Sequence, residues 1–205
     1  LTQTNVDIIK NIAPEITKHA PDAFYIIVSN PVDIMTYAFH KITNIPKNHI
    51  IGTGTLLDTA RLCSRLAEFM NVSQKNVHAY VLGEHGDSMF VPWSLAQVCN
   101  TPLAEYRQNL DFGIIELPEL NYDEVEEYIR TSGSKIISRK GATYYAVSIA
   151  VCHIIECLFS SVNTVMAVST MLNGEYGIED VCMSIPTFVG PGGVKGRVLP
   201  NLTEE

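Results

Sequence analysis

The chain has 205 residues, of which 46% are hydrophobic and 18% charged, and its formal net charge is −8. These values exclude a disordered protein, and the absence of any basic cluster disfavours nucleic acid and anionic membrane surfaces as partners. The number of cysteines, 5, is odd, and none forms a C-x-x-C pair. We therefore expect reduced thiols in a cytoplasmic protein, and no metal site.

The first fifty residues alternate between helical and strand patterns. The predicted elements are a helix over 6–19, a strand over 24–28, a helix over 31–42 and a strand over 49–51. Pro14 is expected to bend the first helix or end its regular part. Asn30 is the predicted N-cap of the second helix, with Pro31 as its first residue. This order predicts an α/β fold with parallel strands, the C-terminal part of a Rossmann-type sheet.

The remaining residues favour longer helices and antiparallel strands. The predicted elements are a helix over 56–70, a strand over 77–82, a strand or helix over 90–98, a connecting loop over 110–121, a charged helix over 123–140, an apolar helix from about 140 to 159, and strands over 164–172 and 181–189. The Asn173-Gly174 turn predicts that the last two strands form an antiparallel hairpin, and a glycine-rich turn at 190–193 predicts another. The apolar helix contains His153 and Glu156, which favours a buried core helix over a membrane span.

The pattern changes near residue 52. We expect residues 1–52 to be the C-terminal remnant of a dinucleotide-binding domain. Residues 53–205 are expected to form an α+β substrate and catalytic domain, truncated where a C-terminal helix begins. The chain lacks an initial methionine and stops where a helix signal appears, so we expect a fragment of a longer protein.

The segment that concentrates candidate chemistry is Val81–Ser88. His85 lies between Gly83 and Gly86, directly after an apolar run, so its imidazole can meet a ligand at a strand end. Histidine changes charge near neutral pH and therefore suits proton transfer. The alternative is a turn that contains a histidine incidentally.

Other residues favour the functional interpretation. Asp58 can orient the imidazole of His85 and stabilise its cation, and Arg61 can bind a substrate carboxylate through two hydrogen bonds. An arginine in the first turn of a helix opposes the helix dipole, which suggests a bound anion, although a solvated charged face would show the same spacing. Asn30 and Thr143 can hydrogen-bond to a ligand, and Asn30 follows a parallel strand, where open α/β sheets bind ligands.

Three sequence blocks carry a family resemblance. They are Ser29-Asn30-Pro31-Val32-Asp33, Leu57-Asp58-Thr59-Ala60-Arg61 and Gly83-Glu84-His85-Gly86-Asp87-Ser88. In order and spacing they resemble the signature blocks of the lactate/malate dehydrogenase family, over nearly the whole chain. The resemblance implies a Rossmann-type fold, a small 2-hydroxy or 2-keto acid substrate, and an oxidoreductase that uses NAD in glycolysis as a cytoplasmic homotetramer.

The resemblance also implies roles for individual residues. His85 would exchange the proton, Asp58 would be its partner, and Arg61 would bind the carboxylate. Asn30 and Thr143 would line the substrate site. The residues expected near the nicotinamide half of NAD are Val28, Ser29, Asn30 and Thr53.

Within the family, the Gly-Glu-His-Gly sequence around His85 is similar to enzymes of L-lactate and pyruvate, whereas malate enzymes usually have Gly-Gly-His-Gly. Thr143 also fits the lactate side, and Asp87 favours lactate over 2-hydroxyisocaproate. A malate dehydrogenase of the lactate-dehydrogenase-like type stays open as the alternative, because the substrate-discriminating loop is expected upstream of residue 1. A third possibility is a non-catalytic fragment that only associates.

Two departures from the family pattern matter. The chain has no convincing G-x-G-x-x-G after a strand, and Gly52-Thr53-Gly54 lacks the third glycine. Family members activated by fructose 1,6-bisphosphate carry an arginine two residues after the carboxylate-binding one and a histidine seven before the catalytic one. His78 matches that histidine, but Cys63 occupies the arginine position. We expect weak or absent activation by the bisphosphate.

Overall fold

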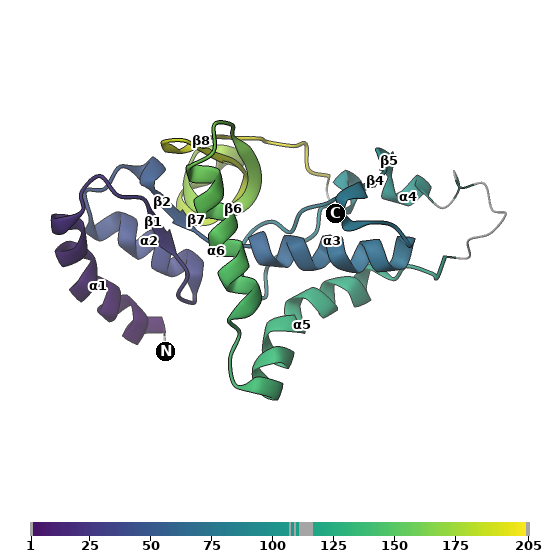
Figure 1. The fold of residues 1–205 in the computed structure, drawn as a ribbon, viewed down its shortest axis with the longest axis horizontal. Helices are drawn as coiled ribbons and strands as arrows, with labels where there is room; N and C mark the ends of the chain where they lie inside the picture. Colours follow the sequence, from purple (N-terminus) through teal and green to yellow (C-terminus); the bar gives the residue numbers. More distant parts are fainter. Residues whose placement is uncertain (1, 107, 109, 111–116, 204–205) are drawn as a thin grey trace.

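A mixed five-stranded sheet forms the centre of the molecule (Figure 1). The computed structural model describes residues 2–106, 108, 110 and 117–203. The sheet has the order β1-β2-β6-β7-β8, with β1 at Tyr25–Ile27, β2 at Ile50–Gly52, β6 at Thr164–Asn173, β7 at Glu179–Gly190 and β8 at Gly193–Arg197. Strands β1 and β2 are parallel, and every later pairing is antiparallel. The predicted α/β class and both hairpins are confirmed.

The sheet crosses the predicted domain boundary. Gly52 of β2 pairs with Ser169 of β6, so the parallel and antiparallel parts form one continuous sheet. A side chain on Gly52 would meet the Thr36 hydroxyl and the Ser169 Cβ, which lie 2.3 and 2.9 Å from an ideal Cβ. Glycine is therefore required for this close approach. The division near residue 52 stays a prediction.

Helices α1 (Thr2–His19) and α2 (Val32–Ile42) pack against β1 and bury an apolar cluster that includes Met35 and Phe39. Pro14 lies inside α1 without ending it. The predicted cap of α2 is wrong, because Pro31 is the N-cap and no side chain bonds to the helix end. The backbone carbonyl of Asn30 instead accepts a hydrogen bond from the Asn5 side chain at 2.7 Å.

A second core surrounds helix α3 (Leu56–Met70), whose predicted bounds are confirmed. It packs on a small sheet made of β3 (Val77–His78), β4 (Gln97–Val98) and β5 (Thr101–Pro102), followed by α4 (Leu103–Tyr106). The predicted strand over 77–82 ends at His78. Beyond it the backbone changes partners, since Leu82 bridges to Phe90 and Gly83 to Ser184. Residues 90–98 contain a 3-10 turn, Trp93–Leu95, before β4.

Helix α5 (Tyr122–Lys140) begins after the predicted loop, of which residues 111–116 lie outside the described part. The Asn121 side chain caps α5 by accepting from the Glu124 N–H at 3.3 Å. Gly141 ends it in the left-handed conformation, with a φ of 82°. The apolar helix therefore starts later than predicted, as α6 at Tyr145–Leu158.

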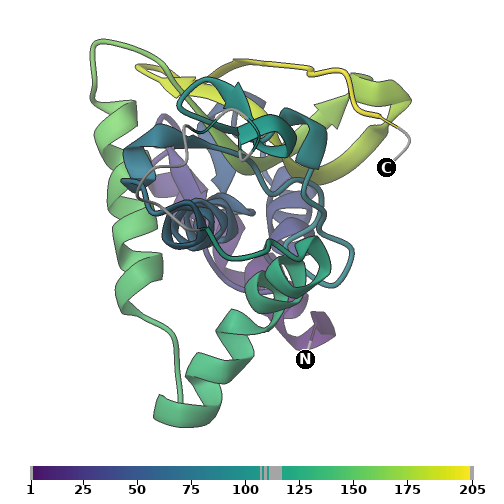
Figure 2. The same ribbon diagram turned by 90° about the vertical axis from the view of Figure 1, so that its right-hand side faces the viewer.

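Only one face of α6 is buried, so the prediction of a buried core helix is partly wrong. Ile154 and Leu158 pack against the sheet, whereas Tyr145 and Ile149 are each 70% exposed. Figure 2 shows α6 along the edge of the molecule. Among the described residues, no helix is both long and apolar enough to cross a membrane.

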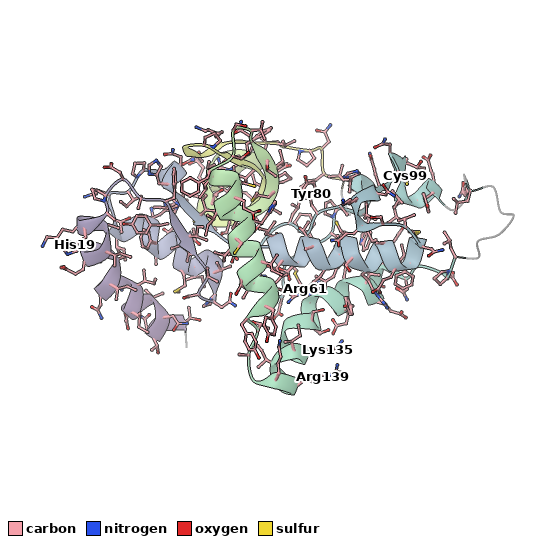
Figure 3. All side chains as sticks on the ribbon, in the orientation of Figure 1. His19, Arg61, Tyr80, Cys99, Lys135 and Arg139 are labelled. Carbon is pink, nitrogen blue, oxygen red and sulfur yellow. The ribbon has the colours of Figure 1, made fainter. Side chains whose placement is uncertain are left out.

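All cysteines of the chain are free thiols. Those at 63, 157 and 182 are buried, in keeping with the expected core role, whereas Cys99 (labelled in Figure 3) and Cys152 are exposed. The described residues contain no group of three histidine, cysteine, aspartate or glutamate side chains placed to hold a metal ion.

Candidate active site

A cavity of about 260 Å³ lies where β1, β2, α3, α5 and α6 approach one another. The sequence-predicted residues that line it are Val28, Asn30, Thr53, Asp58, Arg61, His85 and Thr143. Ser29 is exposed and is not part of the lining. Figure 3 shows Arg61 near the start of α3, close to both α5 and α6. The structure thus gathers residues that are far apart in the sequence.

Asp58 contacts both His85 and Arg61. It lies in the first turn of α3 and is only 1% exposed. One carboxylate oxygen is 2.5 Å from His85 Nδ1, and the other accepts a hydrogen bond from Arg61 Nη1 at 2.9 Å. Because Nδ1 faces the carboxylate, Nε2 is the ring nitrogen available to a substrate. The side chain of Arg61 is 15% exposed, so part of it faces the cavity.

His85 holds its proton more strongly than an ordinary histidine. The hydrogen bond that His85 donates to Asp58 raises the pKa of His85; burial lowers it, and the negative charges of Asp58 and Asp33 raise it further. Arg61 acts in the opposite direction. The net shift is upward, so the imidazolium persists above the usual range, which suits a group that donates a proton near neutral pH.

The sequence did not reveal the role of Asp33. Its Oδ2 accepts a hydrogen bond from the backbone N–H of His85 at 2.8 Å, and its Oδ1 accepts from the Ser169 hydroxyl at 2.5 Å. Burial raises the pKa of Asp33, while these two hydrogen bonds lower it. Asp33 lies within the first resemblance block, but an acidic residue in a first helical turn is ordinary and gave no further signal.

A second set of hydrogen bonds fixes the strand end before His85. The Thr55 hydroxyl donates to the Val81 carbonyl at 2.5 Å, and the Thr55 N–H donates to the Ser184 hydroxyl at 3.0 Å. Gly83 and Ser184 exchange backbone hydrogen bonds of 2.9 and 2.8 Å. Ser184 of β7 therefore holds both Thr55 and the Gly83 backbone, next to the histidine turn, by hydrogen bonds.

Helix α5 supplies a wall of the cavity that sequence reasoning missed. Its lining residues are Arg130, Gly133, Ser134 and Ile137. Their spacing of three, four and seven residues places them on one helical face. That spacing was readable in the sequence, but nothing local indicated that this face meets α3 and α6.

The carboxyl ends of β1 and β2 lie at the cavity. These strands are parallel, and the Thr53 N–H donates to the Ile27 carbonyl at 2.9 Å, which joins the two ends. Val28 offers an apolar surface, and Asn30 and Thr53 offer hydrogen-bonding groups to the same cavity. Ligands of open α/β sheets bind at this position.

The fold and the site together define a class of protein. The carboxyl ends of a partial parallel sheet adjoin a charged cavity lined by a histidine, a buried aspartate and an arginine. This combination occurs in nucleotide-dependent dehydrogenases of the α/β class.

Comparison with known proteins makes the family explicit. Residues 1–52 match the NAD-binding domain of lactate/malate dehydrogenases, and residues 55–205 match the alpha/beta C-terminal domain of the same family. The chain belongs to the lactate/malate dehydrogenase family.

Individual relatives agree with this assignment. The chain is 41% identical to an L-lactate dehydrogenase of Acetivibrio thermocellus, with 95% of the chain and 61% of the relative covered. It is 39% identical to L-lactate dehydrogenase 1 of Clostridium acetobutylicum, with 100% and 64% covered. The chain thus spans less than two thirds of the length of these relatives.

Solved structures are similar along the whole chain. An L-lactate dehydrogenase from Clostridium thermocellum is 38% identical, with a TM-score of 0.88, and is itself covered to 66%. A minor L-lactate dehydrogenase from Enterococcus mundtii, determined in a ligand-bound form, is 33% identical, with a TM-score of 0.90, and is covered to 64%. Both likenesses extend over 100% of this chain.

Proposed function

We propose that the complete protein is an NAD-dependent oxidoreductase that interconverts L-lactate and pyruvate. The observation that carries this proposal is the contact of Asp58 with both His85 and Arg61 inside one cavity. Asp58 then holds His85, the proton donor, at a fixed distance from Arg61, the carboxylate-binding cation. A 2-keto acid needs both groups, because its carbonyl lies next to its carboxylate.

The site residues have separable tasks in this reaction. Arg61 binds the substrate carboxylate, and its bond to Asp58 keeps the guanidinium from rotating. His85 donates its Nε2 proton to the carbonyl oxygen during pyruvate reduction and takes the hydroxyl proton during lactate oxidation. Asp58 stabilises the imidazolium and fixes the orientation of the ring. Asn30 and Thr143 act as substrate-binding residues.

The cofactor end of the site is assigned to Val28, Asn30 and Thr53, which line the cavity, and to Ser29, which lies next to them outside the lining. The chemistry that NAD supplies when bound is hydride transfer. The task of these residues is to hold the nicotinamide ring against the substrate and to keep water from the reacting carbon.

The proposal is tested with the complete protein by following NADH consumption with pyruvate. Arg61→Lys keeps the charge but loses the planar two-donor geometry, so we expect a KM for pyruvate at least about tenfold higher. The matched control is Arg65→Lys on the same helix, where Arg65 pairs with the exposed Glu68 at 2.9 Å. Equal effects of the two substitutions, or no turnover of pyruvate by the wild type, would contradict the proposal.

A malate dehydrogenase of the lactate-dehydrogenase-like type is the second candidate. Arg130 favours it, because a second arginine lines the same cavity and can meet a second carboxylate. Arg130 already lies 3.6 Å from a Glu126 oxygen and 3.8 Å from a Glu127 oxygen, which lowers its attraction for an anion. Comparing kcat/KM for pyruvate and oxaloacetate decides between the two; a higher value for oxaloacetate would overturn the lactate proposal.

The 205-residue chain alone is proposed to be non-catalytic, because it spans less than two thirds of the length of its L-lactate dehydrogenase relatives. The complete protein is proposed to be a cytoplasmic homotetramer that acts in glycolysis. Free thiols support the location, and the exposed apolar face of α6 supports assembly. Sedimentation of the complete protein tests the tetramer, and turnover by the 205-residue chain would contradict its assignment as inactive.

A further inference from the structure

The direction of a substrate's side chain follows from the groups around its reacting carbon. Under the proposed function, on which this inference rests, C2 of a 2-keto acid carries a carboxylate facing Arg61 and an oxygen facing His85. Its hydride-accepting face turns toward Val28 and Thr53 at the ends of β1 and β2. The rest of the lining comes mainly from α5, the start of α6 and residues 86–89. Because the histidine turn already faces the oxygen, the remaining substituent is placed toward α5 and the start of α6.

The part of the cavity wall that α5 supplies has no side chain at Gly133. This glycine is well inside α5, where glycine is among the least favourable residues. An ideal Cβ built on Gly133 has no described atom within 4 Å, so packing within the described chain does not require its absence. By contrast, a Cβ on Gly52 or Gly54 would collide with neighbours. The missing side chain at 133 enlarges the cavity instead of allowing a close backbone contact.

The hydroxyl groups next to Gly133 do not fill this space. Thr131 donates to the Glu127 carbonyl at 2.6 Å, Ser132 to the Tyr128 carbonyl at 2.5 Å, and Ser134 to the Thr131 carbonyl at 2.9 Å. Each hydroxyl is therefore engaged with the backbone of its own helix. These hydroxyl groups therefore leave the space beside Gly133 open and are already hydrogen-bonded.

Beyond Gly133 the lining is apolar. Ile137 of α5 and Val147 and Ala150 of α6 line the same cavity. Such a surface gains from burying methylene groups. The charged lining residue of α5, Arg130, lies three residues before Gly133 and pairs with Glu126 and Glu127. We propose that Gly133 is a specificity-determining residue, and that the site accepts 2-keto acids whose aliphatic side chain is longer than the methyl group of pyruvate.

The test is a substrate series in the complete protein. Pyruvate, 2-oxobutanoate and 2-oxopentanoate are compared by kcat/KM in the wild type and in Gly133→Ala and Gly133→Leu. We expect the wild-type value for 2-oxopentanoate to be within about tenfold of that for pyruvate. Gly133→Leu should lower the 2-oxopentanoate value by about 10-fold or more relative to the pyruvate value, because pocket methylenes discriminate on this scale. Gly133→Ala should act in the same direction but more weakly. Because alanine stabilises a helix relative to glycine, this variant keeps the test valid if Gly133→Leu folds poorly.

A control variant separates pocket shape from helix stability. Lys135→Ala changes the same helix on its opposite face, where Figure 3 shows the side chain pointing away from α6. It should leave the substrate ratio unchanged. A wild-type kcat/KM for 2-oxopentanoate more than about tenfold below that for pyruvate would overturn this inference alone. Equal losses for both substrates in Gly133→Leu would do the same. Failure to reduce any 2-keto acid would overturn the proposed function and this inference with it.

Discussion

The backbone N–H of His85 donates a hydrogen bond to Asp33 Oδ2 at 2.8 Å, across a sequence separation of 52 residues. The other oxygen of Asp33 accepts from the buried Ser169 hydroxyl at 2.5 Å. One carboxylate in the first turn of α2 therefore ties the histidine turn to the central strand of the sheet. His85 is oriented by two aspartates, Asp58 at its ring and Asp33 at its backbone.

Replacing Asp33 should loosen the catalytic turn without removing a group that contacts the substrate. Asp33→Ala leaves the His85 N–H and the Ser169 hydroxyl without their acceptor, which should lower the free energy of unfolding by about 1–3 kcal/mol. The kcat for pyruvate should fall more than the KM changes, since Arg61 is untouched. Asp22→Ala, at an exposed position, is the control. Chemical denaturation and steady-state kinetics measure both effects, and wild-type kcat in Asp33→Ala would contradict the positioning role.

Local patterns predicted those elements whose signals are complete within a short window. The bounds of α3 follow from helical spacing, and the β6–β7 hairpin follows from two apolar strands around Asn173-Gly174. The strand predicted over 77–82 was too long because Leu82 and Gly83 pair with Phe90 and Ser184 instead of one neighbouring strand.

The residues of the candidate site also divide into those that local sequence indicated and those that it did not. Asp58, Arg61 and His85 carry unusual chemistry at the ends of elements, so their types and positions indicated a site. Asp33 and Gly133 carry no such local signal. Their roles depend on which distant segments pack against them, and one sequence does not contain that information.

Removing the carboxylate beside the imidazole should change the pH profile. In Asp58→Asn, the largest cause that raises the pKa of His85 is lost, while burial still lowers it. The protonated form of His85, which pyruvate reduction needs, should then be lost at a lower pH than in the wild type. The alkaline limb of the rate profile therefore shifts to lower pH. Loss of this proton-transfer support should lower kcat by about 100-fold or more. Glu68→Gln, which alters an exposed ion pair of the same helix, should keep the wild-type profile. An unshifted alkaline limb in Asp58→Asn would contradict the assignment.

His40 should make the fold sensitive to mild acid. Burial lowers the pKa of His40 from 6.5 to about 4, helped by the charges of Lys47, Arg197 and Lys41. Its Nε2 has no hydrogen-bond partner among the described atoms. Between these two pH values the unfolded chain binds a proton that the folded chain does not, so stability is lost as the pH falls from 6.5 toward about 4.

The substitution His40→Phe should reduce this acid-side loss, measured as the free energy of unfolding against pH. His78→Gln, at an exposed histidine, should retain the wild-type loss. An identical pH dependence in wild type and His40→Phe would show that His40 is not the titrating group.

Fructose 1,6-bisphosphate should activate the complete protein weakly or not at all. Cys63, at the position where activated family members carry arginine, is 9% exposed, and its Sγ lies 3.6 Å from the Ala79 carbonyl. Burial raises the pKa of the Cys63 thiol, so it stays neutral and offers no charge to a phosphate. The KM for pyruvate should be nearly the same with and without the bisphosphate, in the wild type and in His78→Gln. A large fall in the wild-type KM would contradict this expectation.

The tight turn at Gly54 should tolerate no side chain. Gly54 has a φ of 50°, and an ideal Cβ there would lie 2.1 Å from the Ser184 hydroxyl oxygen and 2.5 Å from the Ser169 nitrogen. Gly54→Ala combines a left-handed backbone with overpacking, so we expect a loss of about 2–5 kcal/mol in the free energy of unfolding. Gly196→Ala is the matched control, because a Cβ at Gly196 has no described atom within 4 Å. Thermal and chemical denaturation of both variants measure the difference. Ser184 also bonds to Thr55 and Gly83, so Gly54→Ala should lose substrate turnover along with stability. Gly196→Ala should lose neither.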